Sequence, residues 1–289
     1  MEKPLFTGVC TALVTPFLND KINHRMYDLL LERQIRAGVK AVVIAGTTGE
    51  SPTLTDLEKI TLFQRAKTVA KERCLVIAGT GSNSTTHSIQ LSIAAEAAGA
   101  DAILIVSPYY NKATADGIYQ HYRSIAQNVS IPIIVYNVPS RTGLDIPVCV
   151  YEKLASIPNI VGVKEANSDV TKIARIRNAC GDQFTVWTGN DDQIVPSMSL
   201  GAKGVISVLS NVMPQETVEL CTAAQNNDFL YAGVLQREFI PLIDVLFSEV
   251  NPIPVKAAMK LIGFDCGSCR LPLCDITTPN YDNLKTLLQ

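Results

Sequence analysis

The sequence has no long apolar run and no block of one charge. Apolar stretches such as 42–44 end within a few residues, well short of the roughly 20 that span a bilayer. Twenty-five basic side chains against 27 acidic ones give a net charge of −2, without the basic run that marks nucleic-acid binding. These absences exclude membrane and nucleic-acid-binding proteins, and no repeat of the collagen or coiled-coil kind is present.

Metal-binding patterns are also missing. The three histidines have no paired ligand spacing, and the eight cysteines supply a single CxxC at Cys266 and Cys269, with Cys274 nearby. One CxxC without a second pair or a neighbouring histidine is a weak zinc signal. We therefore expect no metal site and reduced thiols. Because no segment near the start resembles a secretory signal, we also expect a cytoplasmic protein.

The chain is rich in the residues that build a large core. Of its 289 residues 47% are hydrophobic and only 18% are charged, which suits one large α/β domain or two ordinary ones. One pattern recurs at 38–44, 99–105 and 201–208: a glycine, two or three small or polar residues, and a short β-branched run. The glycine is suited to the position after a helix, and the run to a strand buried on both faces.

Strand-like runs continue along the whole chain. Together with the three above, the runs at 9–14, 75–78, 133–136, 160–164 and 185–188 make eight. Their spacing of roughly 20 to 35 residues leaves room for one βα unit each. Apolar residues at 27, 30, 31 and 35 predict a helix ending at Gly38, a capping box at 55–58 opens another through 71, and further helices are expected before Gly99 and after Pro214.

No phosphate-binding loop accompanies these units. Gly79 and Gly81 lack the third glycine of a dinucleotide fingerprint, and no GxxxxGK[ST] motif is present. The alternation therefore predicts an α/β protein with a (β/α)8 TIM barrel rather than a doubly wound sheet. We expect the catalytic barrel over 1–227 and a small C-terminal helical appendage over 228–289.

Polar residues follow the runs at the end where TIM barrels place their active sites. Lys164 alone among the lysines near strands ends an apolar run at this end, whereas Lys40 and Lys203 precede theirs. Loss of hydration there favours a neutral amine, which attacks a carbonyl carbon to form a Schiff base. The structural alternative is an ion pair with a carboxylate such as Glu165.

Hydroxyl groups near the same end could move protons for this chemistry. Tyr136, Tyr110 and Thr47 are the candidates, although tyrosines at strand ends also serve as packing residues. Arg141 is a forked donor that suits a substrate carboxylate, and its alternative is a surface ion pair. Thr47 and Thr48 could equally form an ordinary turn.

Three motifs resemble the dihydrodipicolinate synthase family, in the pyruvate-dependent class I aldolase superfamily that includes N-acetylneuraminate lyase. They are GTTGE at 46–50, YNVPSRTG at 136–143 and GVKEA at 162–166, and the resemblance runs nearly end to end. It implies an enzyme, a lyase or synthase that condenses pyruvate with L-aspartate-4-semialdehyde through a lysine Schiff base. The product is 4-hydroxy-tetrahydrodipicolinate, in the first committed step of diaminopimelate and lysine biosynthesis, and no metal or organic cofactor is needed.

The resemblance also implies catalytic roles. Lys164 forms the imine with pyruvate, and Tyr136 gives and takes protons in a relay with Thr47 and Tyr110. In this family the second tyrosine of the relay comes from a neighbouring subunit, so a dimer is the minimal active unit. A tetramer made of two dimers is the usual assembly, and the substrates are the only other partners implied.

Four further residues take substrate-binding roles by the same resemblance. Thr48 holds the carboxylate of pyruvate, while Gly189 and Ile206 line the site. Arg141 anchors the carboxylate of aspartate semialdehyde, and it is associated with the members that use this substrate.

The cleft in which some family members bind inhibitory lysine is degenerate here. Its positions are Ser51, Asp56, Lys59, Asn83, His87 and Tyr109. The usual two histidines and glutamate are replaced by Asp56, Lys59 and His87, and Lys59 repels an incoming ammonium by about 1 kcal/mol near a protein surface. We therefore expect weak or absent inhibition by lysine.

Two alternative functions remain open from the sequence. The first is a related aldolase, either N-acetylneuraminate lyase or a 2-keto-3-deoxy sugar-acid aldolase, which keeps Lys164 and Tyr136 but changes the acceptor pocket. The second is a non-catalytic ligand-binding barrel, because a fold alone does not imply a function.

Overall fold

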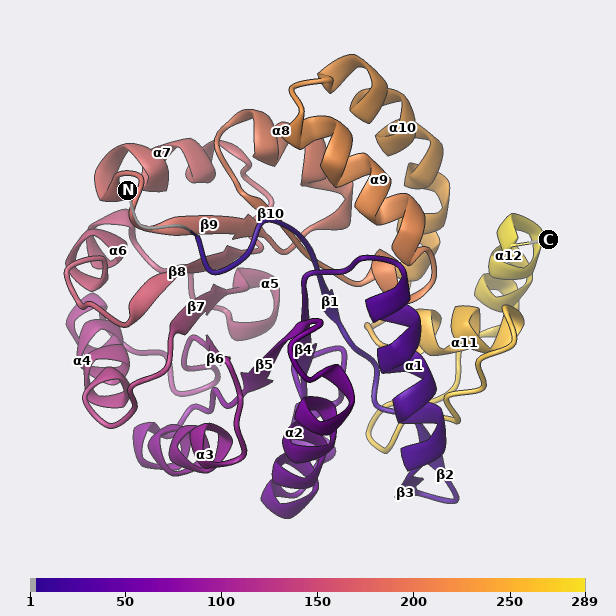
Figure 1. Ribbon diagram of the computed structural model, residues 1–289, viewed down its shortest axis with the longest axis horizontal. Coiled ribbons are helices and arrows are strands. Elements are labelled where there is room, and N and C mark those ends of the chain that lie inside the picture. The colour runs from indigo at the N-terminus through magenta and orange to yellow at the C-terminus, as the bar shows by residue number, and fades with distance from the viewer. Residues whose placement is uncertain (1–3, 289) are drawn as a thin grey trace.

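Eight parallel strands close into a barrel in the computed structural model, which describes residues 4–288 (Figure 1). In chain order they are β1 (Gly8–Ala12), β4 (Ala41–Ile44), β5 (Leu75–Gly79), β6 (Ala102–Val106), β7 (Ile133–Asn137), β8 (Ile160–Glu165), β9 (Thr185–Thr188) and β10 (Gly204–Ser207). Each strand pairs with its neighbours in the sequence, and β1 pairs with both β4 and β10. The predicted TIM barrel is confirmed.

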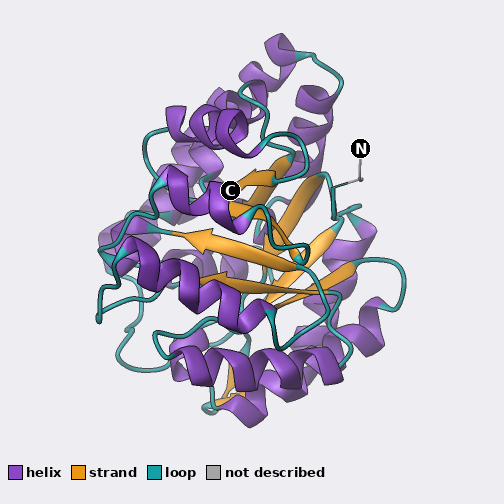
Figure 2. Ribbon diagram, turned by 90° about the vertical axis from the view of Figure 1, so that its left-hand side faces the viewer, coloured by secondary structure: helices purple, strands orange, loops and turns teal. Residues whose placement is uncertain are grey.

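Helices surround this barrel on all sides (Figure 2). Those that follow or cover the strands are α1 (His24–Arg36), α2 (Asp56–Ala70), α3 (Thr85–Ala97), α4 (Ala115–Ala126), α6 (Val148–Leu154), α7 (Thr171–Cys180), α8 (Ile194–Ser199) and α9 (Pro214–Gln225). The predicted capping box of α2 is present, with Thr55 and Glu58 bonded to each other's backbone N–H. A two-residue hairpin, β2 (Phe17–Leu18) and β3 (Lys21–Ile22), precedes α1.

The first strand is shorter than predicted. It ends at Ala12, although the apolar run continues to Val14. The N–H of Leu13 still donates to the Val43 carbonyl, but that of Val14 turns away and donates to the Asn211 side chain at 3.1 Å. A side-chain acceptor therefore ends the ladder where the hydrophobic pattern does not.

Two apolar clusters divide the core. The inner cluster fills the barrel and includes Ile134, Tyr136 and Ile206, and the outer one packs the strands against the helices. On β7 the outer-cluster residues Ile133 and Val135 alternate with Ile134 and Tyr136. Side chains that alternate in this way point to opposite faces of the sheet, so Tyr136 faces the interior and Asn137 faces outward.

Three helices follow the barrel: α10 (Phe229–Leu246), α11 (Ile253–Leu261) and α12 (Thr278–Leu288). Helix α10 packs against α8 and α9, and α12 packs against α10 and α11 (Figure 1). The predicted boundary between 227 and 228 falls in the turn between α9 and α10, while residues 1–3 and 289 of the predicted ranges lie outside the described part of the chain. No helix within residues 4–288 combines the length and the apolar character needed to cross a membrane.

Candidate active site

Lys164 and Tyr136 face each other inside the catalytic end of the barrel. They are register partners on β8 and β7, and the Lys164 Nζ lies 4.5 Å from the centroid of the Tyr136 ring. Both are buried, at 5% and 6% exposure. A register shift between Ile133 and Ile134 skips one residue of β8, so that Lys164, and not Val163, shares the inner face with Tyr136.

Lys164 has no anionic partner in the described part of the chain, where no ion pair or hydrogen bond is formed by its ammonium group. The alternative of an ion pair with Glu165 is wrong. Glu165 is the next residue on the strand and therefore points to the outer face, where Lys172, Tyr151 and Asn137 contact it. The nitrogen of Lys164 is thus left available to a substrate.

Gly189 makes room for the Lys164 side chain. A Cβ built on Gly189 would lie 2.8 Å from Cε and 3.3 Å from Cγ of Lys164, and 2.8 Å from the Cβ of Ala166. Any larger residue at this position would displace the lysine. The predicted role of Gly189 in the site therefore has a steric basis.

The barrel below Lys164 is closed by apolar side chains. Ile206 is fully buried in the inner cluster, and Trp187 stacks on Phe6 with ring centroids 4.7 Å apart. Burial raises the pKa of the neighbouring Cys10 thiol well above its ordinary value, so this thiol stays neutral. The amine consequently lies over a floor that excludes water.

The loop after β4 carries Thr47 and Thr48 and is held by distant residues. Thr48 is buried, and its hydroxyl accepts a hydrogen bond from the Asn251 side chain at 2.9 Å. The loop ends at Glu50, which has a left-handed backbone (φ 59°) and whose carboxylate accepts from Lys256 at 2.8 Å. The sequence alone does not reveal these contacts of Asn251, Glu50 and Lys256, because the partners lie some 200 residues apart in the chain.

Arg141 lies on the short helix α5 (Pro139–Thr142) at the rim of the site. Its guanidinium donates to the backbone carbonyl of Asn251 at 3.2 Å, and within residues 4–288 it forms no ion pair. The alternative of a surface ion pair is therefore wrong. Since one carbonyl occupies a single N–H of the fork, the remaining donors are free for a carboxylate.

A cavity of about 690 Å³ joins the predicted residues of the active site to those of the lysine cleft. The active-site members of its wall are Thr47, Tyr136 and Arg141. The cleft contributes Ser51, Asp56, Lys59, Asn83, His87 and Tyr109, so the structure brings all six together. Lys164 does not line this cavity, but the Tyr136 ring next to its Nζ does.

The cleft end of the cavity contains a small charged cluster. The His87 Nε2 lies 2.9 Å from a carboxylate oxygen of Asp56, and the Lys59 Nζ lies 3.9 Å from Asp56. Lys59 is 7% exposed, and burial lowers its pKa although Asp56 opposes this effect. The cluster therefore holds a buried ammonium without a close hydrogen-bond acceptor among residues 4–288.

Tyr110 does not join the other predicted residues within this chain. Its side chain is 92% exposed, and its backbone is left-handed with φ at 70°. A bulky residue in this conformation is strained unless its surroundings hold it there. Neighbouring Tyr109, in contrast, lines the cavity.

The cysteines and histidines assemble no metal centre among the described residues, where no group of three or more His, Cys, Asp or Glu side chains could hold an ion. All eight cysteines are free, with Cys266 buried, Cys269 half-buried and Cys274 exposed.

Comparison with known proteins identifies the family. The Dihydrodipicolinate synthetase family matches residues 5–289. A 4-hydroxy-tetrahydrodipicolinate synthase of Acetivibrio thermocellus is 46% identical over 289 residues, covering 100% of this chain and 98% of that protein.

Solved structures agree closely with the barrel and its appendage. The chloride-inhibited dihydrodipicolinate synthase of Acinetobacter baumannii, complexed with pyruvate, superposes with a TM-score of 0.96 at 41% identity, covering 98% of this chain and 97% of that one. A structure described as the first monomeric dihydrodipicolinate synthase variant gives 0.96 at 40% identity, covering 98% and 96%. The chain belongs to the dihydrodipicolinate synthetase family.

Proposed function

We propose that this protein condenses pyruvate with L-aspartate-4-semialdehyde through a Schiff base on Lys164. The observation that carries the proposal is a buried, unpaired lysine amine 4.5 Å from the Tyr136 ring, at the catalytic end of a TIM barrel. The relatives named 4-hydroxy-tetrahydrodipicolinate synthase favour this reaction over a sugar-acid aldolase, N-acetylneuraminate lyase or a non-catalytic barrel.

The first half of the reaction forms a nucleophile from pyruvate. The Lys164 amine, once it has given up its proton, attacks the keto carbon, and loss of water gives a cationic imine. Removal of a proton from the methyl carbon then gives the enamine, with the imine nitrogen taking the electron pair. Tyr136, whose ring contacts the nitrogen, is placed to pass these protons, with the hydroxyl of Thr47 on the same cavity wall.

The second half joins the two substrates. The enamine carbon attacks the aldehyde carbon of the semialdehyde, and the resulting alkoxide takes a proton. The amino group of the semialdehyde unit then displaces Lys164 at the imine carbon, which closes the ring and frees the enzyme. Overall, one C–C bond and one C=N bond form and one water leaves, so no oxidant, reductant or cofactor is required.

The positions of the remaining predicted residues support the binding roles proposed for them. Thr48 presents its hydroxyl and loop backbone to the carboxylate of pyruvate, and Ile206 closes the floor below it. Arg141 offers its free N–H donors to the carboxylate of the semialdehyde. Arg141→Ala should therefore cripple turnover of the semialdehyde and leave imine formation with pyruvate largely intact. If the protein were a sugar-acid aldolase, Arg141 would have no semialdehyde carboxylate to bind and this selective loss would not be seen.

The exposed Tyr110 supports an oligomer. The Tyr110 side chain is 92% exposed on a left-handed backbone and does not line the cavity of its own chain, so it is free to complete the proton relay of a second copy. We propose a dimer as the minimal active unit and a tetramer of two dimers as the assembly. One solved relative is a monomeric variant, so sedimentation of the purified protein is the direct measurement. The cytoplasmic location stays a prediction.

Borohydride trapping tests the proposed function directly. Reduction in the presence of pyruvate should add one reduced pyruvate unit to Lys164, detected by mass spectrometry of the digested protein. Lys164→Ala should show no addition, and Lys256→Met, which removes another buried lysine, serves as the matched control that still labels. Absence of label on Lys164 in the wild-type protein would favour a binding barrel. Faster cleavage of sialic acid than use of the semialdehyde would favour the lyase.

A further inference from the structure

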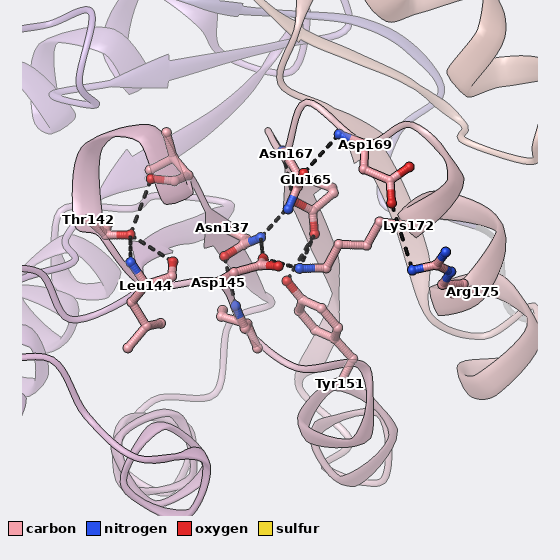
Figure 3. A network of polar contacts seen from close by, with 12 residues as sticks. Asn137, Thr142, Leu144, Asp145, Tyr151, Glu165, Asn167, Asp169, Lys172 and Arg175 are labelled. Atoms are coloured by element: carbon pink, nitrogen blue, oxygen red, sulfur yellow. Dashed lines mark hydrogen bonds and ion pairs between the residues drawn. The ribbon is translucent and has the colours of Figure 1, made fainter.

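A polar cluster lies on the outer face of the barrel directly behind Lys164 and Tyr136. Asn137 follows Tyr136 on β7 and Glu165 follows Lys164 on β8, and the two are register partners (Figure 3). The Asn137 Nδ2 donates to Glu165 Oε1 at 2.7 Å and to Asp145 Oδ1 at 2.8 Å. One amide therefore joins the ends of both catalytic strands.

Glu165 is the hub of this cluster. It is 2% exposed, and Oε1 also accepts from the Asn167 backbone N–H at 2.9 Å. Oε2 accepts from the Tyr151 hydroxyl at 3.1 Å and lies 3.8 Å from Lys172 Nζ. Burial raises the pKa of Glu165, while Lys172 and the hydrogen-bond donors oppose this effect. Each oxygen of the carboxylate thus has two donor or cationic groups beside it.

The cluster also reaches the segment that carries Arg141. Asp145 forms an ion pair with Lys172, the second residue of α7 (Figure 3). The Ile146 N–H donates to Asn137 Oδ1 at 3.1 Å. Residues 138–147 are therefore tied at their far end to the same amide that joins the two strands. The ends of β7 and β8 and the segment that carries Arg141 therefore converge on one set of hydrogen bonds.

Stability alone does not account for such a cluster. A buried ionic network is commonly no more stabilising than apolar side chains of the same volume, but it fixes geometry because each bond is directional. The position behind the reacting groups is where geometry has the largest chemical consequence, since a displacement of about 1 Å can reduce a rate on the order of 100-fold.

We propose that Glu165, acting through Asn137, is a positioning residue that holds the Lys164 amine against Tyr136 for imine formation. The inference rests on the proposed function. It assigns Glu165 no proton transfer and no substrate contact, because the side chain points away from the barrel interior. Its carboxylate fixes the position of the end of β8 relative to the end of β7.

Two substitutions at Glu165 distinguish this positioning role from an acid–base role and from a purely structural one. Glu165→Ala removes the hub, and we expect the rate of borohydride-trapped imine formation to fall roughly 10- to 100-fold per folded molecule, with the KM for pyruvate nearly unchanged because Thr48 lies on another loop. Glu165→Gln keeps a carbonyl oxygen facing Asn137, so it should restore the rate to within about fivefold of wild type. An acid–base role predicts instead that Gln is as harmful as Ala and removes one limb of the pH profile.

A purely structural role predicts a third pattern. Both variants would then lower the unfolding temperature, while labelling per folded molecule would match wild type, and this result would overturn the proposal. Asn137→Ala cuts the same link from the other strand and carries the test if Glu165→Ala does not fold. Asp169→Ala removes an exposed carboxylate that accepts from the Thr171 N–H at the start of α7, and it is the control expected to keep wild-type rates. Failure of the wild-type protein to label at all would refute the proposed function and this inference with it, whereas wild-type labelling together with unchanged labelling of Glu165→Ala would refute this inference alone.

Discussion

Two lysines in different regions of the molecule have nearly the same surroundings but different partners. Lys164 in the barrel and Lys256 beneath the loop after β4 are 5% and 4% exposed. Each ammonium lies over an aromatic ring, with Lys164 4.5 Å from Tyr136 and Lys256 4.4 Å from Phe17. Lys256 has Glu50 at 2.8 Å, however, whereas Lys164 has no carboxylate within ion-pair distance in residues 4–288.

The difference separates a structural lysine from a chemical one. A buried ion pair commits both groups to each other, and removing one partner leaves the other as an uncompensated buried charge. An unpaired lysine in the same setting lowers stability but keeps its nitrogen free for substrate. The two sites therefore respond in opposite ways to the same substitution.

Among these variants, Lys164→Met should have the largest effect on activity, and it should not lower the free energy of unfolding. Turnover should fall by about 10⁴-fold or more, because the covalent route is lost. The free energy of unfolding should stay equal or rise, since an unpaired buried amine is replaced by an apolar side chain of similar size. Steady-state kinetics and urea unfolding measure the two quantities. A large loss of stability would contradict the comparison.

Lys256→Met should reverse this pattern. Glu50 would remain buried without its cation, so the free energy of unfolding should fall by about 3–5 kcal/mol. The folded protein should still label Lys164 with pyruvate and borohydride. The double variant Glu50→Gln with Lys256→Met removes both charges and should recover most of the loss. A single variant as stable as wild type would mean that the pair is not a structural anchor.

The sequence predicts the barrel well, because the fold depends on repeated local patterns. Eight apolar runs, their spacing and the glycines at helix ends are all readable in the chain, and each corresponds to a strand of the barrel. The position of Lys164 at the catalytic end follows from the same patterns. What the sequence does not show is which way Lys164 points.

A bulge in β8 decides the direction of Lys164. Strict alternation from Ile160, which packs in the outer cluster, would place Lys164 outward as well. The register shift against β7 skips one residue and turns Lys164 inward. The partners of Glu50 are equally hidden, since Lys256 lies 206 residues away and only the folded chain brings them together. Motif resemblance predicted the catalytic residues, but it did not predict the contacts that hold them.

The contact between the C-terminal segment and α2 should show its own pH dependence. The Arg270 side chain, hydrogen-bonded to Glu58, lowers the pKa of Glu58 from 4.5 to about 2. The stability that this contact contributes is present above pH 4.5 and is lost as the pH falls from 4.5 towards 2. Glu58→Gln keeps the capping box. The difference in unfolding temperature between wild type and Glu58→Gln should be largest above pH 4.5, shrink as the pH falls towards 2 and vanish only below pH 2, whereas a constant difference would exclude this linkage.

Lys59 is the intermediate case between the two lysines, and it leads to the smallest expected effect. Lys59 is nearly as buried as Lys256, at 7% against 4% exposure, but its carboxylate partner Asp56 is 3.9 Å away and also contacts His87. An entering lysine would bring a second ammonium towards Lys59 and find Asp56 already engaged, so half-maximal inhibition should require more than millimolar lysine. Lys59→Ala should increase sensitivity severalfold by removing that repulsion. Inhibition of the wild-type protein by sub-millimolar lysine would show that the cleft still binds its ligand despite the buried cation.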